Sequence, residues 1–422
     1  MVNLLLDRPE AQKFLWVGNG EPHAIRRRLI LAKYGEQVRK LYGYDHATAW
    51  QVIGVVLVQL YMGYLVRNWS WLAVIVAGYA FSGTANQNLL SAQHEISHCL
   101  AFRRPVYNKI LALASNLVLV APVAVKFREY HHDHHLFLGI DGGDVDLPTV
   151  LEASYVANLA AKLAWGLVYL VIYGVRPLVV RPKAATAADA VNWVTTIGFN
   201  VAVLYFFGLK PVVYWLLGSV LGGSLLHPMG GHLLAEHYMF EKGQETYSYY
   251  GPMNALTYNV GYHNEHHDFP QIPHTRLHKL REIAPEFYEP MYQHHSWCWV
   301  LWRFFADPEV GPWLRVHRLR REGGKATNER FCEYRGLYAV WKRATGGAGE
   351  EAFAPATRGA EAPSAASSAA ARPPLAPAAQ RAPLAAANEV ASPTKRVTRA
   401  SAAHGRHGSS EENAPPATGI AN

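Results

Sequence analysis

The sequence of 422 residues contains only three cysteines, Cys99, Cys298 and Cys332. Three thiols without a CxxC pair exclude a disulfide framework and a zinc ribbon. The first residues also lack a continuous apolar run, because charged and polar side chains interrupt each early one, so no cleavable signal peptide is expected. The formal net charge of +8 is not arranged as one basic stripe, and we therefore expect no nucleic-acid partner.

Basic residues cluster instead beside long apolar segments, for example at 26–28 and 103–104. Such clusters mark the cytosolic side of a membrane protein. Half of the chain is hydrophobic, and a membrane-spanning helix needs about 20 largely apolar residues. Four spans are expected, at 47–66, 69–90, 191–208 and 211–226. The very short connection within each successive pair favours two antiparallel hairpins.

The end of the chain has a different composition. From residue 351 onward it is rich in alanine, proline and serine, and it lacks the apolar residues that a core requires. We therefore expect a disordered tail over 351–422. The rest is expected to comprise a cytosolic N-terminal segment (1–46), a membrane domain (47–320) and a cytosolic connecting segment (321–350).

Three groups stand out among the 21 histidines, and we call them the first, second and third histidine boxes. The first box, HEISH, has two histidines four residues apart, which places them on one face of a helix. The second, YHHDHH, and the third, HNEHH, each contain the spacing HxxHH. The candidate metal ligands in the three boxes are His94, His98, His131, His134, His135, His263, His266 and His267.

Eight imidazoles exceed the four ligands that zinc usually takes, so two metal ions are needed to use them. The first box also matches the HExxH pattern of zinc proteases, with Glu95 as the base, but that interpretation leaves the other two boxes unexplained. A membrane metal-binding protein without enzymatic activity is a further alternative. Histidine-rich sites beside membrane spans favour a pair of iron ions, an interpretation that depends in part on the following resemblance.

The order HxxxH, HxxHH and HxxHH around paired spans resembles the membrane fatty acid desaturase and hydroxylase superfamily. Residues 231–273, GHLLAEHYMFEKGQETYSYYGPMNALTYNVGYHNEHHDFPQIP, look like the sphingolipid Δ4-desaturases, also called dihydroceramide desaturases. DGGDVDLPT at 141–149 and the N-terminal residues 21–43 fit the same family, and the resemblance covers roughly residues 14–320. The second box departs from the family's usual YHMEHH, but it keeps the HxxHH spacing and leaves His132 as an extra imidazole.

The resemblance implies an O₂-dependent enzyme with two iron ions that forms the 4,5-trans double bond in the sphinganine base of dihydroceramide or a related lipid. It also implies electrons from NADH, delivered through cytochrome b5 reductase and cytochrome b5, and a location in the endoplasmic reticulum membrane. Hydroxylation at C4, alone or beside desaturation, is the alternative, because both reactions use the same oxidant. Desaturation of acyl lipids is a third interpretation.

Shared metal ligation constrains the topology, because boxes that hold the same metals must lie on one side of the bilayer. The apolar segment at 107–125 therefore cannot cross once and should be re-entrant or interfacial, and 155–175 should lie in the interface. The sequence thus predicts an all-α integral membrane protein with about four transmembrane helices in two hairpins, additional interfacial helices, and a cytosolic histidine-rich di-iron cap. The N-terminus is expected in the cytosol with the boxes.

Residues outside the boxes complete the predicted site. The segment GHLLAEH after the last span offers a ninth imidazole, for which His237 is favoured and His232 is the alternative. Candidate partners that orient imidazole N–H groups are Asp144, Asp146 and Glu265. No separate catalytic acid or base is assigned. The histidines that match no ligand spacing are expected at the surface, namely His274, His278, His294 and His295.

Overall fold

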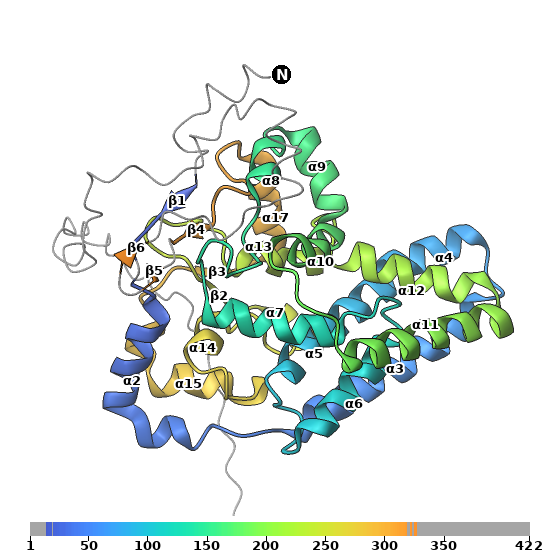
Figure 1. The fold of residues 1–422 in the computed structure, drawn as a ribbon, viewed down its shortest axis with the longest axis horizontal. Coiled ribbons are helices and arrows are strands. Elements are labelled where there is room, and N and C mark those ends of the chain that lie inside the picture. The colour runs from blue at the N-terminus through green and yellow to red at the C-terminus, as the bar shows by residue number, and fades with distance from the viewer. Residues whose placement is uncertain (1–13, 19, 319–320, 323–324, 327–422) are drawn as a thin grey trace, which may run out of the picture. The chain divides into compact units, whose positions relative to one another are not determined.

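The computed structural model describes residues 14–18, 20–318, 321–322 and 325–326, all within one unit of the chain, Met1–Ala369. These residues form mainly helices, and their strands are three pairs of two-residue segments (Figure 1). The expected tail at 351–422 and nearly all of the expected connecting segment at 321–350 lie outside the described residues.

The first apolar helix, α3 (His46–Val66), is long and apolar enough to cross a bilayer. It begins after Asp45, whose side chain accepts a hydrogen bond from the backbone N–H of Ala47. The next apolar run is one helical stretch in three parts, α4 (Trp71–Ala77), the π-helical turn η2 (Gly78–Ser82) and α5 (Gly83–Ser97). The helix expected at 69–90 therefore continues to the first histidine box.

The second apolar pair consists of α11 (Ala187–Phe207) and α12 (Leu209–Gly222). The chain turns between them at Gly208, whose φ of +84° favours glycine. In the part of the chain that the structure describes, α3 and α11 are the two helices that are individually long and apolar enough to span, since α12 has only 14 residues. Helix α12 packs against α3, α4 and α11 (Figure 1).

Two glycines allow α12 to approach the first apolar pair closely. A Cβ atom on Gly218 would lie 2.1 Å from Oγ of Ser82, and a Cβ atom on Gly222 would lie 2.2 Å from the carbonyl oxygen of Gly83. Their four-residue spacing is typical of close helix contacts in membranes. This contact fixes α5, and with it the first histidine box, against α12.

Polar side chains also join the helices of this bundle. The amide of Asn86 on α5 is fully buried and donates to Oγ of Ser219 over 2.9 Å and to the carbonyl oxygens of Val118 and Trp215. Because an unsatisfied amide is costly in an apolar bundle, these bonds tie α5 to its neighbours.

Two further apolar segments form short helices. Helix α6 (Pro105–Asn116) has 12 residues, too few to cross a bilayer alone. Helices α9 (Leu159–Leu167) and α10 (Tyr169–Val180) meet at a bend of 76°, and they would form a third span only if the bent pair crosses as one unit. Both geometries are compatible with the interfacial or re-entrant positions expected for 107–125 and 155–175.

The second box lies on α7 (Ala124–Leu136), which packs on α5, and the third lies on α14 (His263–Asp268) beside them (Figure 1). The other helices are α2 (Pro22–Arg39), α8 (Val150–Tyr155), α13 (His232–Ala235), α15 (Leu277–Ile283), α16 (Pro285–Tyr288) and α17 (Trp297–Ala306). The 3-10 turns are η3 (Pro228–Gly231), η4 (Pro252–Leu256) and η5 (His274–Arg276).

The strands are short connections between distant segments. Strand β1 (Leu15–Trp16) pairs in parallel with β4 (Val316–His317), and Leu15 lies opposite Val316. Strand β2 (Ser248–Tyr249) pairs in parallel with β3 (Gln293–His294). Strands β5 (Arg321–Glu322) and β6 (Lys325–Ala326) are antiparallel. The first pair therefore joins two segments that are far apart in the sequence.

Candidate metal centre

The structure brings the three histidine boxes together in two clusters. One nitrogen from each of five side chains, all within 4.8 Å of one another, forms what we call the five-histidine cluster: His94, His98, His131, His135 and His266. Within it, Nε2 of His131 lies 2.8 Å from Nε2 of His98 and 3.0 Å from Nε2 of His135. Helices α5, α7 and α14 all contribute to this cluster.

The second group, which we call the four-histidine cluster, comprises His134, His237, His263 and His267. Nitrogens of His134, His237 and His267 lie within 4.8 Å of one another. Nε2 of His237 is 3.1 Å from Nε2 of His134 and 2.8 Å from Nε2 of His263. All four side chains are buried.

Each HxxHH box divides its histidines between the clusters. On α7, His131 and His135 face the five-histidine cluster and His134 faces the other. On α14 the division is reversed, since His263 and His267 join the four-histidine cluster and His266 joins the five-histidine one. Residues four apart share a helix face, whereas adjacent residues differ by about 100°, which explains the split.

The donor set fits metal ions. Burial lowers the pKa of His94 to about 3 and holds the pKa of His98 and His131 well below 6.5, so these imidazoles are neutral. A neutral imidazole has one acceptor nitrogen. Two acceptor nitrogens that point toward each other cannot form a hydrogen bond, because neither carries a hydrogen. Nε2 of His94 and of His267 are buried without a hydrogen-bond partner among the described residues. A cation between the imidazoles would satisfy these lone pairs.

A buried carboxylate orients one of the histidines. Nδ1 of His134 lies 2.9 Å from Oδ1 of Asp144 and 3.4 Å from Oδ2 of Asp146. Burial raises the pKa of Asp144, but the charge and hydrogen bond of His134 outweigh it and lower the pKa to about 2. Asp144 is thus an acceptor for the Nδ1–H group, which directs Nε2 of His134 to the cluster. Glu265 instead accepts hydrogen bonds from Ser248 and Tyr250.

The two candidates for a ninth ligand occupy different positions. His237 lies within the four-histidine cluster, whereas His232 has both nitrogens engaged elsewhere. Nε2 of His232 is 2.6 Å from the side-chain nitrogen of Gln87, and its Nδ1 is 2.6 Å from Oε1 of Glu236. The geometry therefore favours His237.

Two of the histidines expected at the surface are buried, so that prediction was wrong for His274 and His294. The ring of His274 packs on Tyr258 at 5.2 Å, and His294 packs against Phe240 and Tyr247. Both rings pack among aromatic side chains. A histidine without a ligand spacing can therefore be buried, and the sequence pattern does not indicate which ones are. His278 is half-buried and His295 is exposed.

Two other sequence features lie outside the clusters. His132 is exposed, and its Nε2 is 3.0 Å from the carbonyl oxygen of Ser97. Glu95, the base in the zinc-protease interpretation, is buried and accepts a hydrogen bond from the backbone N–H of His274. Burial raises the pKa of Glu95 to about 8. This carboxyl group is therefore held by the backbone of η5 and does not join the histidine clusters.

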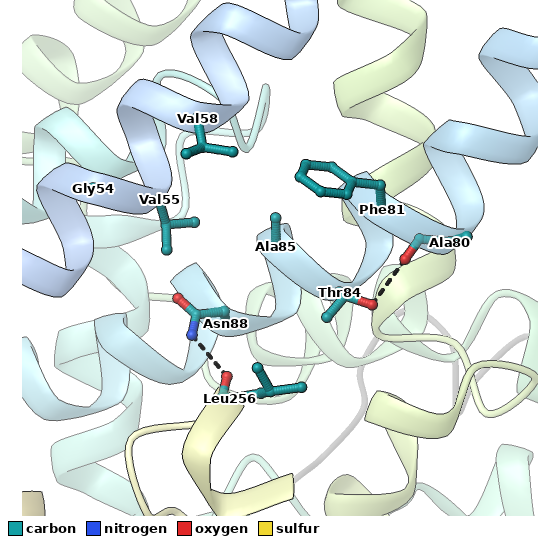
Figure 2. A pocket seen from close by; sticks show the side chains of 9 residues that line it. All are labelled: Gly54, Val55, Val58, Ala80, Phe81, Thr84, Ala85, Asn88 and Leu256. Carbon is teal, nitrogen blue, oxygen red and sulfur yellow. Dashed lines mark hydrogen bonds between the residues drawn. The ribbon is translucent and has the colours of Figure 1, made fainter.

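An apolar groove of about 350 Å³ lies on another face of α5 (Figure 2). Its base includes Asn88, whose side-chain nitrogen donates to the carbonyl oxygen of Leu256 over 2.7 Å. Asn88 lies about 120° around the helix from His94, so the groove and this histidine occupy different faces of α5. The lining suits a hydrocarbon chain and consists of Gly54, Val55, Val58, Ala80, Phe81, Thr84, Ala85, Asn88 and Leu256.

The chain is similar to known families over most of its described length. A family model described as fatty acid desaturase matches residues 69–299, and a model described as sphingolipid Δ4-desaturase matches residues 10–47. The sphingolipid delta(4)-desaturase DES1 of Drosophila melanogaster is 47% identical over 310 residues, which cover 73% of this chain and 96% of that protein.

Two human proteins are similar over a comparable length of the chain. The sphingolipid delta(4)-desaturase/C4-monooxygenase DES2 is 47% identical over 310 residues, or 73% of this chain and 95% of that protein. The sphingolipid delta(4)-desaturase DES1 is 43% identical over 313 residues, or 74% of this chain and 96% of that protein.

Proposed function

Because the chain belongs to the fatty acid desaturase family and, within it, to the sphingolipid Δ4-desaturases, we propose that it forms the 4,5-trans double bond in the sphinganine base of dihydroceramide. The convergence of nine histidines in two clusters is the structural observation that supports this proposal most strongly. The product is the unsaturated base of ceramide, and the enzyme is an oxidoreductase of sphingolipid synthesis.

The proposed cofactor is a pair of iron ions, one held by each cluster. Two bound iron ions and O₂ would supply the oxidising power that an unactivated C–H bond requires, which side-chain acids and bases cannot provide. The protein contributes nine imidazoles, the orientation of His134 by Asp144, and burial of the four-histidine cluster away from water. His232 is proposed to support the site through Glu236 and Gln87 without binding metal.

The proposed setting is the endoplasmic reticulum membrane, with the N-terminus and the boxes in the cytosol. Four spans in two hairpins, α3 with α4–α5 and α11 with α12, would leave all three boxes on one side. In this topology α6, α9 and α10 lie in the interface. Electrons are proposed to come from NADH through cytochrome b5 reductase and cytochrome b5.

A second activity, hydroxylation at C4, is supported by one specific observation. The human relative named as both desaturase and C4-monooxygenase is as similar, at 47%, as the Drosophila desaturase. The two reactions differ in whether a second hydrogen is removed from the lipid, and the same histidine clusters can serve both. We therefore propose C4-hydroxylation as a side activity.

The proposed function is tested by expressing the chain in a host that lacks the enzyme and analysing its long-chain bases by mass spectrometry. A 4,5-trans base is the expected product, and 4-hydroxysphinganine beside it would reveal the second activity. Cells that express the full-length protein in the membrane but make neither base would contradict the assignment to sphingolipids.

Replacing Asp144 by asparagine is expected to weaken iron binding about 10- to 100-fold, a typical effect of removing the partner that orients a ligand histidine. The measurement is an Fe(II) titration of the purified metal-free protein. Asp133→Asn is the matched control, because the Asp133 carboxylate lies 2.7 Å from Nζ of Lys183 and outside both clusters. Equal affinities for the two variants would show that Asp144 does not act on the metal.

A further inference from the structure

The helix that carries the third box is too short to be stable by itself. Helix α14 has six residues, and three of them are proposed ligands. Short helices gain little from their own hydrogen bonds, and the carbonyl groups of the last turn have no partner within the helix. The position of His263, His266 and His267 must therefore be fixed by other parts of the protein.

The N-terminal helix α2 provides the missing partners. Arg27 on α2 donates through Nε to the carbonyl oxygen of Asp268 and through Nη2 to the carbonyl oxygen of His267, the second over 2.9 Å. These are the last two residues of α14. A guanidinium group at this end also complements the negative end of the helix dipole. Arg27 therefore closes the C-terminus of α14 with two hydrogen bonds.

The side chain of Asp268 anchors the same end of α14. It is completely buried, and its Oδ1 lies 2.8 Å from Nδ1 of His23. Its Oδ2 accepts hydrogen bonds from Nε of Arg26 and from the hydroxyl group of Tyr288, the latter over 2.9 Å. A buried carboxylate with so many partners holds its backbone in one position. Helix α2 contributes two of these three partners.

The contact extends from the backbone to a proposed ligand. The ring of His23 packs on the ring of His267 at 4.9 Å between centroids. Nε2 of His23 is fixed in turn by Oγ1 of Thr246 at 2.9 Å. Since α14 supplies two of the four histidines of the four-histidine cluster but one of the five in the other, a displacement of α14 affects the four-histidine cluster most.

We propose that α2 positions the third histidine box, with Arg27, Arg26 and His23 acting as positioning residues for the four-histidine cluster. The inference rests on the proposed metal centre and assigns to the N-terminal segment a role in metal loading. The basic residues at 26–28 are thus not one uniform cluster, because Arg26 and Arg27 contact α14 whereas Arg28 is exposed.

The test is an Fe(II) titration of the full-length, metal-free protein in detergent, with iron per chain as the readout. We expect Arg27→Ala to keep one tightly bound iron and to bind the second about 10- to 100-fold more weakly than the wild type. Arg27→Lys should show the same defect, because an ammonium group cannot reproduce the planar fork of two N–H donors. The neighbouring Arg28→Ala should bind two irons as the wild type does.

Leu280→Ala distinguishes the positioning of the third box from a general loss of stability. This variant removes a fully buried side chain from the core that α2 shares with α15. This variant is expected to lower the Tm of the metal-free protein but to keep two tightly bound irons. If Leu280→Ala loses the second iron as Arg27→Ala does, or if Arg27→Ala and Arg27→Lys both keep it, the inference is wrong. If Arg27→Ala does not fold, the affinity of Arg27→Lys for the second iron tests the inference instead. A wild-type protein that binds fewer than two irons would instead contradict the proposed metal centre.

Discussion

Replacement of His131 by alanine is expected to reduce product formation by more than about 100-fold, beyond the effect of changing a residue that only orients a ligand. His131 lies at the middle of the five-histidine cluster, with Nε2 within 3.0 Å of Nε2 in both His98 and His135. Its loss removes one nitrogen and leaves the other four around a gap. The measurement is the ratio of unsaturated to saturated long-chain base in cells that express equal amounts of each variant.

The adjacent residue provides the control for this experiment. His132 is on the same helix and has the same side chain, but it is exposed and contacts the carbonyl oxygen of Ser97. His132→Ala should retain most of the activity. If His131→Ala retains as much activity as His132→Ala, then the clusters seen in the structure do not carry the chemistry. A membrane protein that binds metal without catalysis then becomes the better interpretation.

Alanine replacements of His237 and His232, which follow the last apolar helix, are expected to have very different effects. His237→Ala should also reduce activity by more than about 100-fold and should remove one of two irons, because His237 is central to the four-histidine cluster. His232→Ala should have a smaller effect of about 10-fold, because its nitrogens face Gln87 and Glu236. Activity and iron per chain are measured together on the purified variants.

The reverse order of effects would change the ligand assignment. If His232→Ala loses an iron while His237→Ala keeps both, then His232 is the ninth ligand and Glu236 is the carboxylate that orients it. Histidine-to-glutamine replacements at both positions provide a further control, since glutamine keeps the size of the side chain and a polar end but lacks the imidazole nitrogens.

The histidine boxes could be predicted from the sequence because ligand spacing is a local property of a helix. His94 and His98, or His131 and His135, are four residues apart, and any helix places such pairs on one face. The division of each HxxHH box between two clusters depends on how three helices pack, so no spacing indicates that His266 belongs with His94. The apolar runs at 47–66 and 191–208 likewise predicted α3 and α11, which are long and apolar enough to cross a bilayer.

Other features depend on tertiary contacts that have no local signal. The sequence places the basic residues at 26–28 among the charges beside apolar segments, but Arg26 and Arg27 contact a segment more than 230 residues away. His274 and His294 lack a ligand spacing and yet are buried against aromatic rings. Asp144 is a candidate in the sequence, and its burial and its 2.9 Å contact with His134 distinguish it from a solvated carboxylate.

Iron content per chain decides whether the two histidine clusters are metal sites. The structure groups nine histidines into two clusters, and we propose that each cluster binds one iron. The wild-type protein, purified without oxygen and loaded with Fe(II), should bind two irons per chain by elemental analysis, and His131→Ala and His237→Ala should each bind fewer. A fully active wild-type protein that contains one iron, or zinc in place of iron, would show that the two clusters do not form a di-iron centre.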